Sequence, residues 1–118
     1  MESIKKVLIT KHGKKFYAKN LDEDLHTQYG FIKKEDLKEA GEGILLKSNT
    51  SKEFFVFNPY FIDLYRKIKR DAQIIPLKDI GFIIAETGIN KESRILDAGS
   101  GSGALACFLA SVAKEIVT

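Results

Sequence analysis

The first half of the chain alternates hydrophobic and polar residues over short stretches, which is the pattern of half-buried β-strands. Two hairpins are predicted, the first from residues 5–11 and 14–19 and the second from residues 44–47 and 54–57. His12-Gly13 is the predicted turn of the first hairpin, because glycine tolerates positive φ, and Asn49-Thr50-Ser51 is the turn of the second. Short strands at close spacing predict a small barrel-like β domain.

The pattern changes at Asn58-Pro59, where asparagine is a good helix N-cap and proline a good first helical residue. Apolar residues then recur at helical spacing, at Phe61, Leu64, Tyr65 and Ile68. We therefore place a domain boundary near Asn58. The two predicted domains are residues 1–58, a small β domain, and residues 59–118.

In the second domain the sequence predicts a helix, a strand, a glycine-rich turn and a further helix. Pro76 disfavours helix at the residue before it, so residues 73–77 are predicted to be extended or looped. A helix is predicted over residues 79–87, with Gly88 as its C-cap. A strand follows over residues 94–98 and a helix over residues 103–113, and residues 115–118 return to β-prone residues.

Composition excludes several classes of protein. The chain has 118 residues, of which 44% are hydrophobic and 30% charged, and this suits a globular domain. The net charge of +3 permits an anionic partner such as RNA but does not require one. Cys107 lies in an apolar helical stretch and is expected to be a structural thiol. No metal-ligand spacing, signal peptide or membrane-spanning run is seen, so we expect a cytoplasmic protein without metal or membrane.

The glycine-rich turn carries the candidate chemistry. Asp97 ends an apolar strand, and Gly99, Gly101 and Gly103 follow before an Ala/Leu-rich helix. Glycines at such a turn let bare backbone approach a ligand. The turn lacks the Gly-Lys-Ser/Thr ending of a phosphate-binding P-loop, which excludes that motif. A glycine-rich linker before a core helix is the structural alternative.

The string from Asp97 to Leu105 resembles the first motif of S-adenosylmethionine-dependent methyltransferases with a Rossmann-like fold. The resemblance implies that the turn passes beneath the methionine part of S-adenosyl-L-methionine and that Asp97 orients this part. Residues 69–79 resemble the segment that lines the cofactor pocket in the tRNA (adenine-N1)-methyltransferases of the T-loop. That family commonly has Tyr-Pro-Lys-Asp where this chain has Pro76-Leu77-Lys78-Asp79. The implied cofactor-binding residues are Gln73, Ile74, Ile75, Pro76, Leu77, Asp97, Ala98, Gly99, Ser100, Gly101, Ser102, Gly103, Ala104 and Leu105.

The first domain also fits this family. The run from His26 to Gly30 resembles the family's His-Thr-x-x-Gly, and residues 54–59 resemble its strand before a proline-started helix. Small barrels often bind nucleic acid. The candidate RNA-binding residues are His26, Thr27, Tyr29, Lys33 and Lys34.

The resemblance implies a fold and a function for the whole protein. The fold would be α+β, with the small β-barrel-like domain followed by the truncated start of a Rossmann-like α/β domain. The function would be methyl transfer to N1 of a tRNA adenine by an enzyme that forms homo-oligomers, tetramers by the resemblance. The ribose-binding acidic residue and the catalytic residue would fall beyond Thr118, so no residue here is assigned to the chemical step, and we expect this chain alone to be inactive.

Two other functions stay open from the sequence. The β domain could be an RNA-binding or oligomerisation module without activity. Alternatively, the chain could belong to a methyltransferase that acts on another class of substrate.

Overall fold

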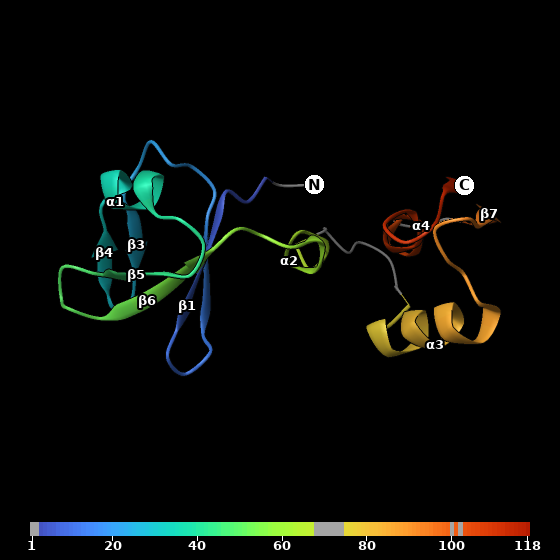
Figure 1. Ribbon diagram of the computed structural model, residues 1–118, viewed down its shortest axis with the longest axis horizontal. Coiled ribbons are helices and arrows are strands. Elements are labelled where there is room, and N and C mark those ends of the chain that lie inside the picture. The colour runs from blue at the N-terminus through green and yellow to red at the C-terminus, as the bar shows by residue number, and fades with distance from the viewer. Residues whose placement is uncertain (1–2, 68–74, 100, 102) are drawn as a thin grey trace. The chain divides into compact units, whose positions relative to one another are not determined.

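The computed structural model describes residues 3–67, 75–99, 101 and 103–118. By its contacts the chain divides into two compact units, one ending at Leu64 and the other running from Tyr65 to Thr118. Figure 1 labels most elements of both units. The domain boundary near Asn58 stays a prediction.

The first unit is built on a four-stranded antiparallel sheet with the strand order β2-β1-β6-β5. Its strands are β1 (Lys6–Thr10), β2 (Lys15–Ala18), β5 (Ile44–Lys47) and β6 (Glu53–Phe57). Both predicted hairpins are confirmed, as β1–β2 and β5–β6. The central pairing joins β1 to β6, with Leu8 opposite Val56. In the described part of this unit β2 and β5 are the sheet edges and no closed barrel forms, so the barrel-like shape is not confirmed.

A third hairpin and a short helix also belong to this unit. The hairpin consists of β3 (Leu25–Thr27) and β4 (Gly30–Ile32), and α1 (Lys34–Glu39) follows it directly, as Figure 1 shows. The sequence did not predict α1, because Leu37 is its one buried residue and a single apolar position gives no periodicity. Acidic residues in its first turn and Lys38 in its last suit the helix dipole.

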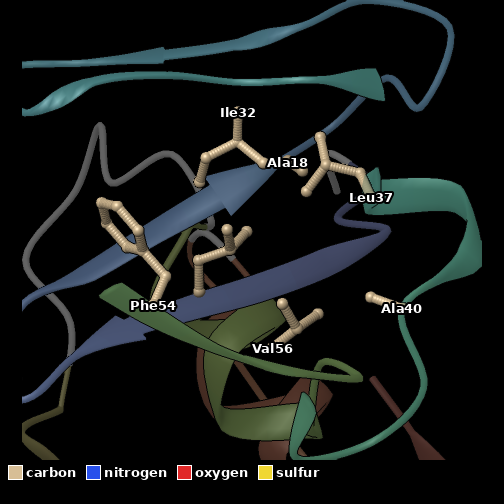
Figure 2. Packing of buried hydrophobic residues seen from close by; sticks show 7 residues of the cluster. Ala18, Ile32, Leu37, Ala40, Phe54 and Val56 are labelled. Carbon is tan, nitrogen blue, oxygen red and sulfur yellow. The ribbon is translucent and has the colours of Figure 1, made fainter. Parts of the chain in front are cut away.

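The hydrophobic core joins these elements, and Figure 2 shows its packing. Leu8 from β1, Phe54 and Val56 from β6, Ile32 from β4 and Leu37 from α1 are all fully buried. Burial of each such side chain stabilises the fold by about 1.5–3 kcal/mol. The core therefore attaches the β3–β4 hairpin and α1 to one face of the sheet.

Helix α2 (Phe61–Tyr65) begins later than predicted. Asn58 does not cap it, because the Asn58 side-chain oxygen lies 3.4 Å from Lys6 Nζ and the Asn58 N–H donates to Glu42. Instead, the carboxylate of Asp63 accepts the Tyr60 N–H at 2.9 Å, which is the reach-back contact of a capping box. Asp63 therefore sets the start of the helix.

The second unit contains α3 (Leu77–Thr87), β7 (Arg94–Leu96), α4 (Ala104–Ala110) and β8 (Glu115–Val117). The predicted C-cap of α3 is confirmed, because Gly88 has φ +72° and its N–H donates to Ile84 O. Strands β7 and β8 pair in parallel, with Ile95 opposite Ile116, and α4 lies between them in the chain. This β–α–β arrangement is the repeating unit of parallel α/β sheets. Both β7 and α4 are shorter than predicted.

Candidate functional site

The turn between β7 and α4 begins at Asp97, the first residue after β7. The Asp97 N–H donates to Val117 O at 2.7 Å, which extends the parallel pairing by one bond. Its carboxylate accepts a hydrogen bond from the Thr118 hydroxyl at 3.3 Å. The half-buried side chain is thus held at the carboxyl end of β7, where ligands bind in open α/β sheets.

All three glycines of the turn have positive φ, at +83° for Gly99, +55° for Gly101 and +80° for Gly103. A Cβ added at any of them meets no atom within 4 Å. The glycines are therefore required by the backbone conformation, and the space above them is open to a ligand. Gly103 also precedes α4, and its carbonyl accepts the Cys107 N–H at 2.8 Å.

These residues fit the methionine part of S-adenosyl-L-methionine. The exposed backbone of Gly99 and Gly101 offers polar groups without side chains in the way. Asp97 offers a carboxylate suited to an ammonium group. Behind the turn, Ala104 is buried and Leu105 is half-buried, so these two anchor the helix while Ala98 is exposed.

Other predicted cofactor residues are placed differently. Ile75 and Pro76 lie just before α3, and Leu77 is its first residue, so the predicted extended segment ends one residue earlier than expected. Gln73, Ile74, Ser100 and Ser102 lie outside the described residues. The role of the upstream segment in a cofactor pocket stays a prediction.

The candidate RNA-binding residues fall into two groups. His26, Lys33 and Lys34 line one hollow of about 700 Å³ beside the β3–β4 hairpin. Its other lining residues are Phe31 and the acidic side chains of Glu23, Asp24 and Glu35. The structure therefore brings three of the five candidates together.

Thr27 and Tyr29 shape the hairpin turn instead of lining this hollow. The Thr27 hydroxyl donates to Gly30 O at 2.8 Å and accepts the Tyr29 N–H at 3.0 Å. The Tyr29 ring packs edge-on to Phe16 at 6.2 Å between centroids, and Lys52 Nζ lies 4.7 Å from its centre. Whether Thr27 or Tyr29 contacts RNA stays a prediction.

Phe31 lines the hollow but was not among the candidates predicted from the sequence. A signal was present, because Leu25 and Ile32 are apolar and face the core, so alternation places His26 and Phe31 on the opposite face of the hairpin. The three acidic lining residues, Glu23, Asp24 and Glu35, could be found only from the structure, because they come from a loop and from the unpredicted helix α1.

The described residues contain no cluster of three potential metal ligands among His, Cys, Asp and Glu. Within the same part of the chain, no helix is both long and apolar enough to cross a bilayer.

Comparison with known proteins adds to this geometry. No family model matches the chain. It is 36% identical to the tRNA (adenine(57)-N(1)/adenine(58)-N(1))-methyltransferase TrmI of Methanocaldococcus jannaschii over 90% of its own length. It is 31% identical to the tRNA (adenine(58)-N(1))-methyltransferase TrmI of Thermus thermophilus over 76% of its length. The resemblance to the tRNA (adenine-N1)-methyltransferases is confirmed.

Two solved structures are similar as well. One is the tRNA (m1A58) methyltransferase TrmI of Aquifex aeolicus, with a TM-score of 0.75 and 30% identity over 98% of this chain and 45% of that one. The other is an S-adenosylmethionine-dependent O-methyltransferase of Thermotoga maritima, with a TM-score of 0.78 and 29% identity over 95% of this chain and 42% of that one. The chain spans about a third of the length of the curated TrmI relatives, 36% and 35%.

Proposed function

We propose that this chain supplies the cofactor turn and an RNA-contacting β unit to a methyltransferase that modifies N1 of an adenine in tRNA. The observation that carries the proposal is the turn after β7, where Asp97 is followed by three glycines of positive φ under open space. The similarity of the chain to the TrmI enzymes supports tRNA as the class of substrate.

At the cofactor end, S-adenosyl-L-methionine would supply an electrophilic methyl group on its sulfonium. The carboxylate of Asp97 would hold the ammonium of the methionine part, and the backbone of Gly99 and Gly101 would lie against that part. These contacts fix the position of the cofactor, and orientation alone contributes a large share of catalysis in group transfer. No residue of this chain is assigned to the proton removed from the adenine.

For the RNA, Lys33 and Lys34 are exposed, adjacent in sequence, and both line the hollow. We propose that they contact tRNA phosphates, together with His26 on the hairpin. This would also allow the first unit to bind RNA without any activity of its own.

The decisive experiment is a methyl-transfer assay on unmodified tRNA. The open reading frame extended past Thr118 is compared with this chain, and the product is identified as N1-methyladenosine. We expect activity from the extended protein alone. If the extended protein binds the cofactor but leaves tRNA unmodified, the cofactor site stands and the substrate belongs to another class, which the similarity to an O-methyltransferase makes worth screening.

The glycine turn can be tested by calorimetry with S-adenosyl-L-methionine on the extended protein. Gly101→Ala places a methyl group where we propose the cofactor lies, and it should weaken binding at least tenfold, or about 1.4 kcal/mol. Gly88→Ala is the matched control, because Gly88 also has positive φ and open space but caps α3. Equal losses in the two variants would indicate backbone strain and no ligand contact.

Two further properties belong to this proposal. We propose a cytoplasmic homo-oligomer, a tetramer by its resemblance to the family. Light scattering on the extended protein tests the subunit number, and a monomer would contradict it.

A further inference from the structure

The hollow beside the β3–β4 hairpin has the features of a binding site for a flat polar ring. Its lining includes the cross-strand pair His26 and Phe31, whose ring centroids lie 5.9 Å apart at 45°. Both rings point away from the core, because their neighbours Leu25 and Ile32 pack into it. Phe31 is half-buried and lines this open hollow, and aromatic rings favour stacked or edge-on contacts with other flat rings.

The backbone of Phe31 is held on both sides. On one side it pairs with His26 in the hairpin. On the other, the Phe31 N–H donates to Asn49 Oδ1 at 2.8 Å, and Phe31 O accepts the Asn49 N–H at 3.0 Å. The Phe31 backbone is therefore held in place before a ligand binds, which lowers the entropic cost of binding.

The charges around the hollow are mixed. Lys33 and Lys34 are opposed by Glu23, Asp24 and Glu35. One Asp24 oxygen is already occupied, because Asp24 Oδ1 accepts the Lys34 N–H at 2.9 Å. A site for phosphate alone would not place carboxylates beside its lysines, whereas carboxylates accept hydrogen bonds from the amino groups of nucleobases.

We propose that this hollow binds one unpaired, amino-bearing nucleobase of an RNA strand, stacked on Phe31, with the adjoining phosphates at Lys33 and Lys34. The inference rests on the proposed function for its RNA partner and names the part of the RNA that is recognised. A base paired in a duplex has no free face, so the site selects single-stranded segments such as loops. Uracil, which lacks an amino group, is the weakest ligand.

The test measures binding of short single-stranded RNA to this chain by fluorescence anisotropy, without cofactor or methyl transfer. Phe31→Leu keeps an apolar side chain on the hairpin but removes the stacking face. We expect it to weaken binding of an oligoadenylate or oligocytidylate about five- to hundredfold. Phe55→Leu is the matched control, because Phe55 is an exposed phenylalanine of β6 outside this hollow, and it should leave affinity unchanged.

The lysines are tested by the salt dependence of the same binding. Lys33→Ala with Lys34→Ala should lower the slope of log affinity against log salt by about 0.7 for each phosphate that the protein no longer neutralises. Lys11→Ala with Lys47→Ala removes the same charge from the β1–β2 turn and from β5, outside the hollow, and should leave the slope unchanged.

The inference would be overturned by equal affinity for oligouridylate, by equal affinity for duplex RNA, or by no effect of Phe31→Leu. Equal affinity for free AMP would also overturn it, since the ligand would then be a mononucleotide. The proposed function can fail separately. If this chain binds single strands through Phe31 but the extended protein does not methylate tRNA, the hollow stands and the enzyme assignment falls. If the extended protein methylates tRNA equally well with Phe31→Leu, and this chain binds no oligonucleotide, the enzyme assignment stands and the proposed nucleobase site falls.

Discussion

Replacing Gly30 by alanine tests how the β3–β4 hairpin is held against the β5–β6 turn. Gly30 has φ +102°, and a Cβ built there would lie 2.2 Å from Asn49 Oδ1 and 3.2 Å from a Thr50 methyl group. Asn49 Oδ1 is the atom that accepts the Phe31 N–H. The added methyl group therefore forces the Asn49 side chain away and breaks this hydrogen bond.

The cost has two parts. An alanine held at this positive φ costs about 1–3 kcal/mol of stability. The broken hydrogen bond to Phe31 adds about 0.5–1.5 kcal/mol. We therefore expect Gly30→Ala to lower the free energy of unfolding by about 1.5–4.5 kcal/mol, a large share of the stability of a small domain.

Two matched glycines separate these terms. Gly43 has φ +76° but open space where a methyl group would be added, so Gly43→Ala reports strain alone, at about 1–2 kcal/mol. Gly41 lies outside the positive-φ range, and its Cβ would meet Ile44 at an ordinary 3.8 Å. Gly41→Ala should thus stay within about 0.5 kcal/mol of the wild-type chain.

The assay is urea unfolding followed by the NMR signals of Leu8 and Val56, which report on the core of the first unit. If Gly30→Ala costs no more than Gly43→Ala, the clash with Asn49 is refuted. The same substitution made in an Asn49→Ala background should cost only the strain. An unchanged cost there would show that another neighbour is responsible.

Other contacts of the first unit give further predictions under the same assay. Leu37→Ala leaves a cavity where α1 meets the core and should cost about 2–5 kcal/mol; a cost below this range would mean that α1 contributes little to the core. Ser48→Ala removes a hydroxyl that donates to Tyr29 O at 2.8 Å and should cost about 1–3 kcal/mol, whereas Ser48→Thr should recover part of it. A hydrogen bond from Lys38 and its charge lower the pKa of Asp22, so this pair stabilises the fold above the usual aspartate pKa and is lost as pH falls through the lowered value. Asp22→Asn should therefore remove a small, acid-sensitive part of the stability, and identical pH profiles for the two chains would contradict this.

Local patterns predicted the fold where neighbours in sequence are also neighbours in space. The β1–β2 and β5–β6 hairpins and the Gly88 cap of α3 are of this kind. The pairing of β1 with β6 joins segments that are far apart in sequence, and neither strand has a local pattern that identifies the other as its partner. The start of α2 was misplaced because Asp63 makes the capping contact in place of Asn58. Helix α1 depends on a tertiary contact of Leu37, which composition does not reveal.

In the candidate site, too, features set by local sequence could be predicted and features set by tertiary contacts could not. Positive φ at all three turn glycines was foreseeable from their spacing after an apolar strand. Grouping of His26 with Lys33 and Lys34 required the hairpin to lead directly into α1. The separation of Thr27 from that group could not be predicted, since it follows from the hydrogen bonds of one hydroxyl in a tight turn.

The position of β1 in the sheet has a consequence for synthesis on the ribosome. This strand is made first among the four, yet it lies at the centre of the sheet, with β6 as its second partner. Until Phe57 has left the ribosome, one edge of β1 lacks its native partner and is exposed to other nascent chains. The pairing of β1 with β6 is slowed further because it must close the long chain segment between the two strands, which costs conformational entropy. A chaperone that covers this edge of β1 during synthesis would reduce misassembly. Slowing translation before β6 should raise the yield of misassembled protein.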